Sequence, residues 1–232
     1  MNPAVIDRLS RIPVEDRAAL RKMWSGEIPQ RAELGSQAAL LVIDMTEAFV
    51  RDDYPTGWAA TGEPCAAALA GVVAAARRHG VPVLYTRTEP LAHAAEVGGW
   101  LRGRPGPSMF PFDSPGPHHD IVPELKPEPA DIVFAKPKPS AFFGTQLTGL
   151  LTALRVHTVV VTGMTTSGCV RATVNDAFML NFRVVVPVDC VADRSQLSHE
   201  VELFDMGAKY ADLVESADVI RGFAAPAAER SP

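Results

Sequence analysis

Short apolar runs that alternate with helical segments constrain the fold of this chain more than any other feature. Such runs occupy residues 38–43, 81–86, 131–134, 158–162 and 183–187. Most of them lack the polar–apolar alternation of a strand with one exposed face, so both faces of each strand must be covered. Strands of this kind, separated by helices, predict a parallel sheet between two helical layers.

The segments between these runs complete the expected fold. Helical patterns are expected at residues 14–24, 66–79, 143–154, 169–180 and 199–209, and a sixth strand is expected at 217–220. We therefore expect an α/β fold, a three-layer α-β-α sandwich. Its six-stranded, mainly parallel sheet is expected to have the Rossmann-like order 3-2-1-4-5-6.

The 232 residues fit one large domain with short appendages. We expect an N-terminal helical arm over residues 1–30, packed on the body or on another subunit, and one domain over 31–223. Residues 224–232 are expected to form a flexible tail. Residues 87–130 are rich in proline and glycine and predict a long ordered excursion over one end of the sheet.

Composition excludes several classes of protein. A net charge of −5 disfavours a nucleic-acid binder, and no apolar run approaching about 20 residues is evident, so no membrane partner is expected. The first residues lack the apolar core of a secretory signal, and Cys65, Cys169 and Cys190 are too scattered for a disulfide framework, so we expect a cytoplasmic protein. Neither GxGxxG nor GxxxxGK[ST] occurs, so no nucleotide cofactor is expected.

Three chemically active residues follow three of the expected strands: Asp44, Lys136 and Cys169. The carboxyl ends of parallel strands share one edge of a sheet, so these residues can converge there. Cys169 begins a helical pattern, where free N–H groups and the helix dipole favour a thiolate. A carboxylate beside it can act as a general base, and a lysine can lower the pKa of the thiol.

Each residue also has a simpler interpretation. Asp44 can cap a turn, Cys169 can be an inert buried thiol, and Lys136 can be a solvated loop residue. Lys138 competes with Lys136 for the lysine position.

The segments Leu-Val-Ile-Asp44-Met, Lys136 four residues before Ser140-Ala-Phe-Phe-Gly-Thr, and Thr-Thr-Ser-Gly-Cys169-Val resemble the cysteine hydrolases of the isochorismatase-like superfamily. The resemblance covers about residues 38–220 and implies a catalytic triad of Asp44, Lys136 and Cys169. Its spacing selects Lys136 over Lys138.

Within that superfamily the chain is most similar to N-carbamoylsarcosine and maleamate amidases, through the segments 166–173, Asp193-Arg194 and 203–212. This resemblance implies a cis peptide bond between Met164 and Thr165. It also implies an oxyanion hole formed by the N–H groups of Thr165 and Cys169.

The implied activity is cysteine-dependent hydrolysis of a linear amide or N-carbamoyl C–N bond in a small acid, with release of ammonia. Arg194 is expected to bind the substrate carboxylate, or else to form a salt bridge with a nearby acid. Phe49, Trp58 and Phe142 are expected to line the substrate pocket.

No catalytic metal or other cofactor is expected, because residues 86–93 lack the Asp-x-His pattern that nicotinamidases carry after the second strand. Relatives form homodimers or homotetramers, so a homo-oligomer is expected. Two alternatives remain open. One is another C–N hydrolase of the superfamily, of the ureidoacrylate, biuret or nicotinamide type. The other is a non-catalytic redox or partner protein.

Overall fold

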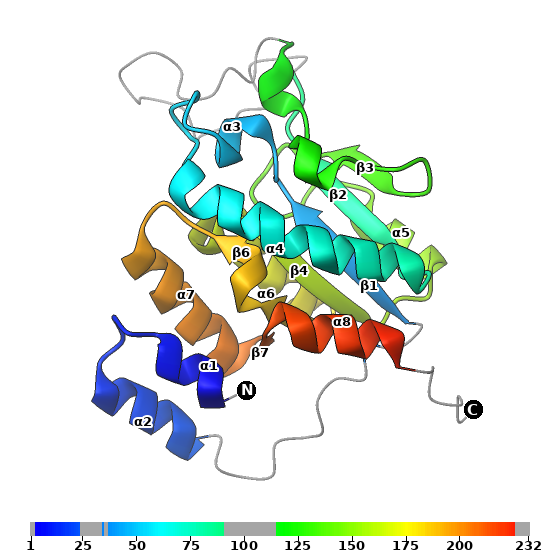
Figure 1. Cartoon of the computed structure of the whole chain (residues 1–232). Helices are drawn as coiled ribbons and strands as arrows, with labels where there is room; N and C mark the ends of the chain where they lie inside the picture. Colours follow the sequence, from blue (N-terminus) through cyan, green and yellow to red (C-terminus); the bar gives the residue numbers. More distant parts are fainter. Residues whose placement is uncertain (1–2, 24–33, 35–36, 91–114, 226–232) are drawn as a thin grey trace, which may run out of the picture.

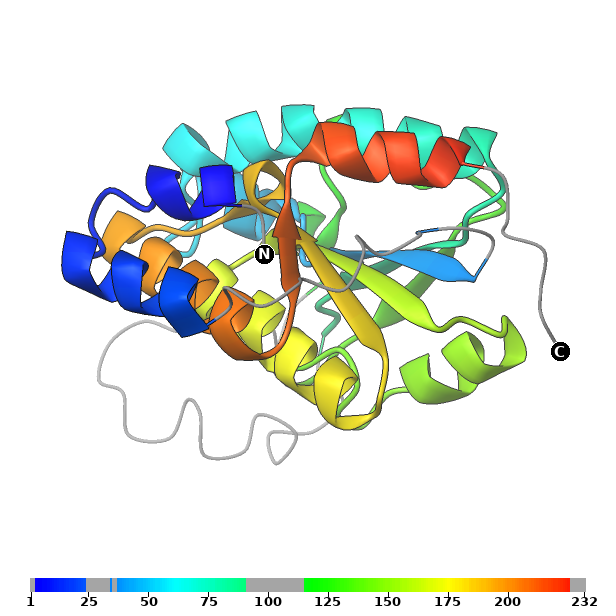
Figure 2. The same cartoon turned by 90° about the horizontal axis from the view of Figure 1, so that it is seen from below.

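The structure, a computed structural model, describes residues 3–23, 34, 37–90 and 115–225. A sheet lies between two helical layers (Figures 1 and 2). Its strands are β1 (Ala38–Ile43), β2 (Val83–Arg87), β3 (Ile132–Ala135), β4 (Thr158–Met164), β5 (Arg183–Pro187), β6 (Val191–Ala192) and β7 (Asp212–Val214).

The strand order is β3-β2-β1-β4-β5-β7, with β6 paired to β4, and every strand pairing is parallel. The predicted three-layer sandwich and its order are therefore confirmed, with β7 in the position of the sixth strand. The two-residue strand β6 was not predicted.

Helices α4 (Ala59–Arg78) and α8 (Ser216–Ala224) cover one face of the sheet (Figure 2). On the other face lie α5 (Leu147–Ala153), α6 (Arg171–Met179) and α7 (Gln196–Lys209). The short helix α3 (Glu47–Val50) follows β1, and the single turns η3 (Pro117–His119) and η4 (Pro123–Leu125) precede β3.

Strand β1 shows why the central strands are apolar throughout. All six of its residues are at most 2% exposed. Leu40 and Val42 pack in the cluster under α4 and α8, whereas Leu41 and Ile43 pack in the cluster under α5, α6 and α7. Full burial of each such side chain contributes about 1.5–3 kcal/mol, so both helical layers depend on this strand.

Helix α4 begins seven residues before the predicted start at Ala66. Gly62 and Pro64 are helix-breaking residues by sequence, but Gly62 lets the helix approach its neighbours closely. A Cβ at Gly62 would lie 3.0 Å from Val50 Cα and 3.3 Å from Met164 Sδ. Glycine is favoured at this position because any larger residue would place its Cβ too close to the backbone of Val50.

Helix α4 also corrects the expectation that no apolar segment reaches membrane-spanning length. By length and composition alone it could cross a membrane. Its buried residues, including Leu69 and Val72, pack in the cluster against the sheet. That packing explains the apolar composition.

The predicted strand at 217–220 is wrong, because these residues belong to α8. Glu215 and Asp218 form a reciprocal capping box that starts this helix. The strand that completes the sheet, β7, lies just before the box.

The N-terminal arm consists of α1 (Pro3–Arg8) and α2 (Val14–Met23), of which α1 was not predicted. Val5, Leu9 and Ile12 join the cluster under α5, α6 and α7. Arg8 forms a 2.9 Å ion pair with Glu215. The first part of the arm therefore packs on the body of its own chain. Most of the predicted excursion (91–114) and most of the predicted tail (226–232) lie outside the described residues.

Candidate active site

Three strand ends bring Asp44, Lys136 and Cys169 together. Asp44 directly follows β1 and Lys136 directly follows β3. Cys169 lies beyond β4 in η5 (Thr166–Val170), a single π-helical turn that leads into α6. Strands β1 and β4 are neighbours in the sheet, and the strand order reverses its direction between them. The three residues therefore lie at the carboxyl ends of the strands beside this topological switch point, where α/β sheets bind ligands.

The side chains are in direct contact. Lys136 Nζ lies 2.8 Å from Asp44 Oδ2 and donates to Cys169 Sγ at 3.4 Å. It also donates to the carbonyl of Lys138 at 2.9 Å. Asp44 is 1% exposed and Lys136 is 5% exposed, while Cys169 is half-buried. The structure thus places Lys136, rather than Lys138, in a sheltered cluster with the acid and the thiol.

Thr86, in β2, holds the carboxylate of Asp44. Its hydroxyl donates to Asp44 Oδ1 at 2.7 Å and accepts from the Asp44 N–H at 3.1 Å. Asp44 also has a φ of +49°, in the left-handed region that is uncommon for residues other than glycine. Such a backbone conformation costs on the order of 1–3 kcal/mol and is found most often at functional sites.

Burial raises the pKa of the Cys169 thiol to about 12; the positive charge of Lys136 acts in the opposite direction, and the negative charge of Asp44 adds to the rise. For Lys136, burial opposes the charged form, but Asp44 and Cys169 outweigh burial and the pKa is raised. The resting cluster therefore holds a thiol and an ammonium group. Burial and the nearby carboxylate therefore act against the preference for a thiolate that the helix N-terminus provides.

The turn that carries Cys169 has an unusual backbone. The peptide bond between Met164 and Thr165 is cis, at the position that the resemblance implies. The carbonyl of Thr165 accepts from the N–H groups of Gly168 at 3.0 Å and Val170 at 3.1 Å, which flank the N–H of Cys169. This arrangement forms the π-helical turn and positions the sulfur in front of α6.

Gly163 allows β4 to lie against β1 just before this turn. Its φ is +104°, and a Cβ there would lie 2.1 Å from the carbonyl oxygen of Ile43. Only glycine fits this close approach of two backbones.

Thr173 in α6 connects two parts of the site. Its hydroxyl donates to the carbonyl of Cys169 at 2.7 Å and accepts from the N–H of Ala141 at 3.0 Å. The segment after Lys136 is thereby tied to the helix after Cys169. Sequence reasoning missed the roles of Thr86 and Thr173, because a buried threonine in a strand or helix has no local pattern that marks its partner.

The structure places the predicted substrate-binding residues in different surroundings. Arg194 is exposed and its Nε donates to the carbonyl of Thr56 at 2.8 Å. Within the described ranges it forms no salt bridge. The Trp58 N–H donates to the carbonyl of Phe49, so these two residues are neighbours. Phe142 instead stacks on Phe182 in the cluster on the other face of the sheet.

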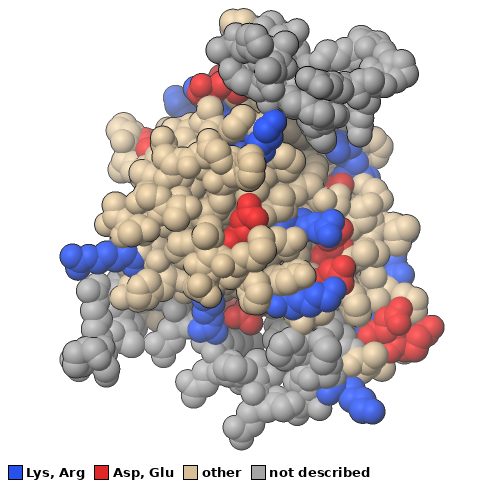
Figure 3. All heavy atoms as spheres, turned by 180° about the vertical axis from the view of Figure 1, so that it is seen from behind, with Lys and Arg blue, Asp and Glu red and all other residues tan. Residues whose placement is uncertain are grey.

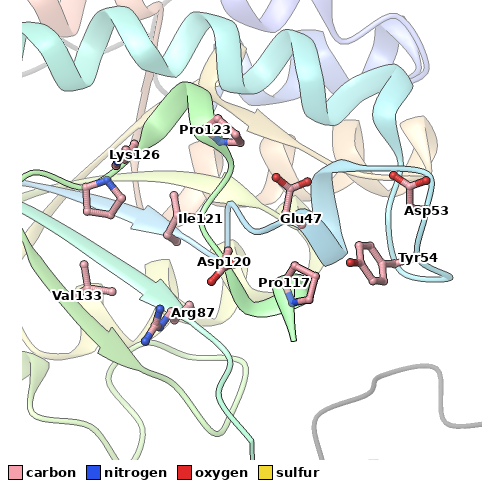
Figure 4. A pocket seen from close by; sticks show the side chains of 11 residues that line it. Glu47, Asp53, Tyr54, Arg87, Pro117, Asp120, Ile121, Pro123, Lys126 and Val133 are labelled. Atoms are coloured by element: carbon pink, nitrogen blue, oxygen red, sulfur yellow. The ribbon is translucent and has the colours of Figure 1, made fainter. Parts of the chain in front are cut away.

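A separate surface cleft of about 770 Å³ lies beside α3, η3 and η4 (Figure 4). Tyr54, Ile121 and Val133 line it together with charged residues such as Arg87 and Asp120. None of Asp44, Lys136 and Cys169 lines this cleft. Among the residues that the structure describes, no group of three His, Cys, Asp or Glu side chains could hold a metal ion.

The chain is similar to known proteins over most of its length. The model of the isochorismatase domain family matches residues 38–218. A maleamate amidohydrolase from Pseudomonas putida is 35% identical over 213 residues, which are 90% of this chain and 97% of that protein. An N-carbamoylsarcosine amidase from Arthrobacter sp is 32% identical over 196 residues, which are 82% of this chain and 72% of that protein.

The crystal structure of a cysteine hydrolase from Pseudomonas syringae pv. phaseolicola superimposes with a TM-score of 0.74. The match covers 85% of this chain and 96% of that chain at 21% identity. At that identity the likeness shows the shared fold alone.

Proposed function

Because the chain belongs to the isochorismatase domain family, we propose that it is a cysteine-dependent amidohydrolase that releases ammonia from a small acid. The bond cleaved is a linear amide or N-carbamoyl C–N bond. The observation that carries this proposal is the contact of Lys136 with both Asp44 and Cys169 at the carboxyl edge of the sheet.

The charges of the cluster suit nucleophilic catalysis. The pKa of about 12 means that Cys169 is a thiol at neutral pH and needs a base at the moment of attack. Asp44 accepts the proton of Cys169 as the sulfur attacks the substrate carbonyl carbon. Lys136 stabilises the developing thiolate, so the sheltered site never holds an unpaired charge.

The reaction then proceeds in two halves. Asp44 passes the proton to the substrate nitrogen, the C–N bond breaks, and ammonia leaves a thioester on Cys169. A water molecule gives a proton to Asp44 and attacks the thioester carbonyl. The C–S bond breaks, Asp44 returns this proton to the departing sulfur so that the thiol and the carboxylate are both restored, and the acid product leaves.

The oxyanion of each tetrahedral intermediate is bound by the N–H groups of Thr165 and Cys169. Support comes from the hydrogen bonds of Gly168 and Val170, whose N–H groups flank that of Cys169 in the turn. Removal of one such donor typically lowers kcat by about 100- to 1,000-fold.

The substrate carries a carboxylate that Arg194 binds. The Nε of Arg194 donates to the Thr56 carbonyl, and no acid in the described part of the chain forms an ion pair with this guanidinium group. Phe49 and Trp58, which are joined by a backbone hydrogen bond, give the acid an apolar wall, whereas Phe142 lies in the cluster on the other face of the sheet and is not part of this wall. Maleamate is the first candidate substrate, because the maleamate amidohydrolase matches over nearly its whole length.

Ammonia release from maleamate, N-carbamoylsarcosine and nicotinamide tests the function. Turnover of either acid, with little turnover of nicotinamide, is the expected result. Cys169→Ser, Asp44→Asn and Lys136→Ala should each lower kcat by at least about 1,000-fold. Lys138→Ala is the matched control and should keep near wild-type activity. Substantial activity of Cys169→Ser would refute the cysteine mechanism.

The two alternatives predict different results. A hydrolase of the ureidoacrylate, biuret or nicotinamide type would show the same dependence on the three residues but prefer another amide. A redox-responsive thiol needs a low pKa, and burial of Cys169 acts against this.

We also propose that the chain forms a homodimer or homotetramer. The face behind the sheet, covered by α5 and α6, has a broad area without charged side chains (Figure 3). Phe178, Met179 and Leu180 at the end of α6 are exposed. Sedimentation velocity tests this proposal, and a monomer at micromolar concentration would contradict it.

A further inference from the structure

Asp193 follows β6 and is 4% exposed, yet its carboxylate accepts from four donors. Oδ2 accepts from the N–H and the hydroxyl of Ser167, both at 2.7 Å. Oδ1 accepts from the N–H of Arg194 at 2.8 Å and from that of Ser195 at 3.5 Å. One buried side chain thus joins the turn that carries Cys169 to the segment that carries Arg194.

The surrounding backbone holds Asp193 in this place. Strand β6 pairs with the end of β4, with Gly163 opposite Val191 and Met164 opposite Ala192. Thr61 in α4 donates to the carbonyl of Asp193 at 2.9 Å. The carboxylate is therefore anchored by the sheet on one side and by α4 on the other.

The geometry points to Asp193 as a positioning residue that aligns the nucleophile and the substrate anchor through one carboxylate. This inference rests on the proposed function for its kinetic consequences. Ser167 lies two residues before Cys169, so a shift of Ser167 moves the sulfur away from Lys136. A misplacement of about 1 Å lowers the rate by about 100-fold.

Only a carboxylate satisfies all four donors. Both oxygens of an ionised aspartate accept hydrogen bonds, whereas asparagine has one oxygen and an NH₂ group that donates. In Asp193→Asn the NH₂ group would face either the Ser167 donors or the Arg194 and Ser195 N–H groups. In the described part of the chain no lysine or arginine forms an ion pair with Asp193, so these donors are what stabilise its charge.

Asp189 provides a matched control. It lies four residues earlier, and its carboxylate accepts from the N–H of Ser216 at 2.8 Å and from the Ser216 hydroxyl at 2.5 Å. It therefore holds α8 and not the turn of Cys169. Asp189→Asn makes the same chemical change at a site without a connection to the cluster.

The experiment compares Asp193→Asn and Asp189→Asn by kcat and KM for maleamate, by the rate of Cys169 alkylation with iodoacetamide at pH 9, and by Tm. Asp193→Asn should lower kcat by about 100-fold and also raise KM. Its alkylation should slow by at least threefold, because Lys136 no longer stabilises the thiolate. Asp189→Asn should lower Tm with kcat, KM and alkylation close to wild type.

Equal kcat in the two variants would overturn the inference. If Asp193→Asn does not fold, Ser167→Ala removes one of the four donors and should lower kcat by roughly tenfold; unchanged kcat in that variant would also overturn it. If wild-type protein hydrolyses no amide, the proposed function fails and the alkylation rates alone decide. An alkylation rate of Asp193→Asn equal to that of Asp189→Asn would then reject the positioning role.

Discussion

Replacement of Lys136 by methionine tests the central contact of the site through stability as well as activity. Methionine fills a similar volume but removes the charge that lies 2.8 Å from Asp44 Oδ2. At an effective dielectric constant of about 20, two unit charges at this distance attract by about 6 kcal/mol. Desolvation of both groups offsets part of this attraction, so loss of one partner should destabilise the fold by about 3–5 kcal/mol.

The assay is urea unfolding at pH 7, followed by tryptophan fluorescence. Lys136→Met should unfold at a much lower urea concentration than wild type, because the Asp44 carboxylate remains buried without its cation. The double variant Asp44→Asn/Lys136→Met should recover most of the lost stability, since neither charge remains. All variants with a change at Asp44 or Lys136 should be inactive.

Lys138→Met is the control, because Lys138 accepts from Lys136 through its backbone carbonyl, which this substitution keeps. It should unfold close to wild type. Wild-type stability of Lys136→Met, or a double variant less stable than Lys136→Met, would refute the interpretation of the contact as a buried ion pair.

Three further predictions concern the thiol, an acid-sensitive histidine and a backbone contact. Because the pKa of Cys169 is about 12, its alkylation by iodoacetamide should rise about tenfold per pH unit from pH 7 to 10; a plateau near pH 8 in that rate profile would contradict the raised pKa. Burial lowers the pKa of His199 below its ordinary value of 6.5. As the pH falls through 6.5, the histidine therefore takes up a proton in the unfolded state before it does so in the folded state. The free energy of unfolding then decreases by up to about 1.4 kcal/mol per pH unit. His199→Gln should flatten this loss in urea titrations between pH 7 and 5, and parallel curves would exclude the histidine as its source. Gly163→Ala should destabilise the fold by at least about 3 kcal/mol, because the strain of a positive φ adds to a clash of the new Cβ with Ile43. The control Gly144→Ala, at a φ of +72° with nothing within 4 Å of the new Cβ, should lose only about 1 kcal/mol of stability. Equal Tm values for the two variants would reject the clash.

The sequence predicted the catalytic candidates well, because strand ends are visible in the apolar pattern. Asp44 and Lys136 each follow the last residue of a fully or largely apolar run, and a parallel sheet brings such ends to one edge. A segment that carries signals for both a strand and a helix was predicted wrongly. Residues 217–220 are a short, largely apolar run that was predicted as a strand, but the capping box of Glu215 and Asp218 starts a helix there.

The protonation state of Cys169 shows the limit of local reasoning. Its position before a helix favours a thiolate by a local effect of less than about 1 kcal/mol at an exposed site. Burial and the carboxylate of Asp44 raise the pKa instead, and both depend on segments that are distant from Cys169 in the sequence. The role of Thr86 likewise depends on a distant segment, because its hydroxyl binds the carboxylate of Asp44.

By itself, the sequence predicted the layers of the fold and three candidate residues at strand ends, because apolar period and strand ends are properties of neighbouring residues. Only the tertiary structure decided the distances among these side chains, which hydroxyls and carboxylates hold the site, and how burial shifts the pKa of the thiol. Those outcomes depend on distances of about 3 Å between distant segments and on burial from water, which arise when the strands and helices pack.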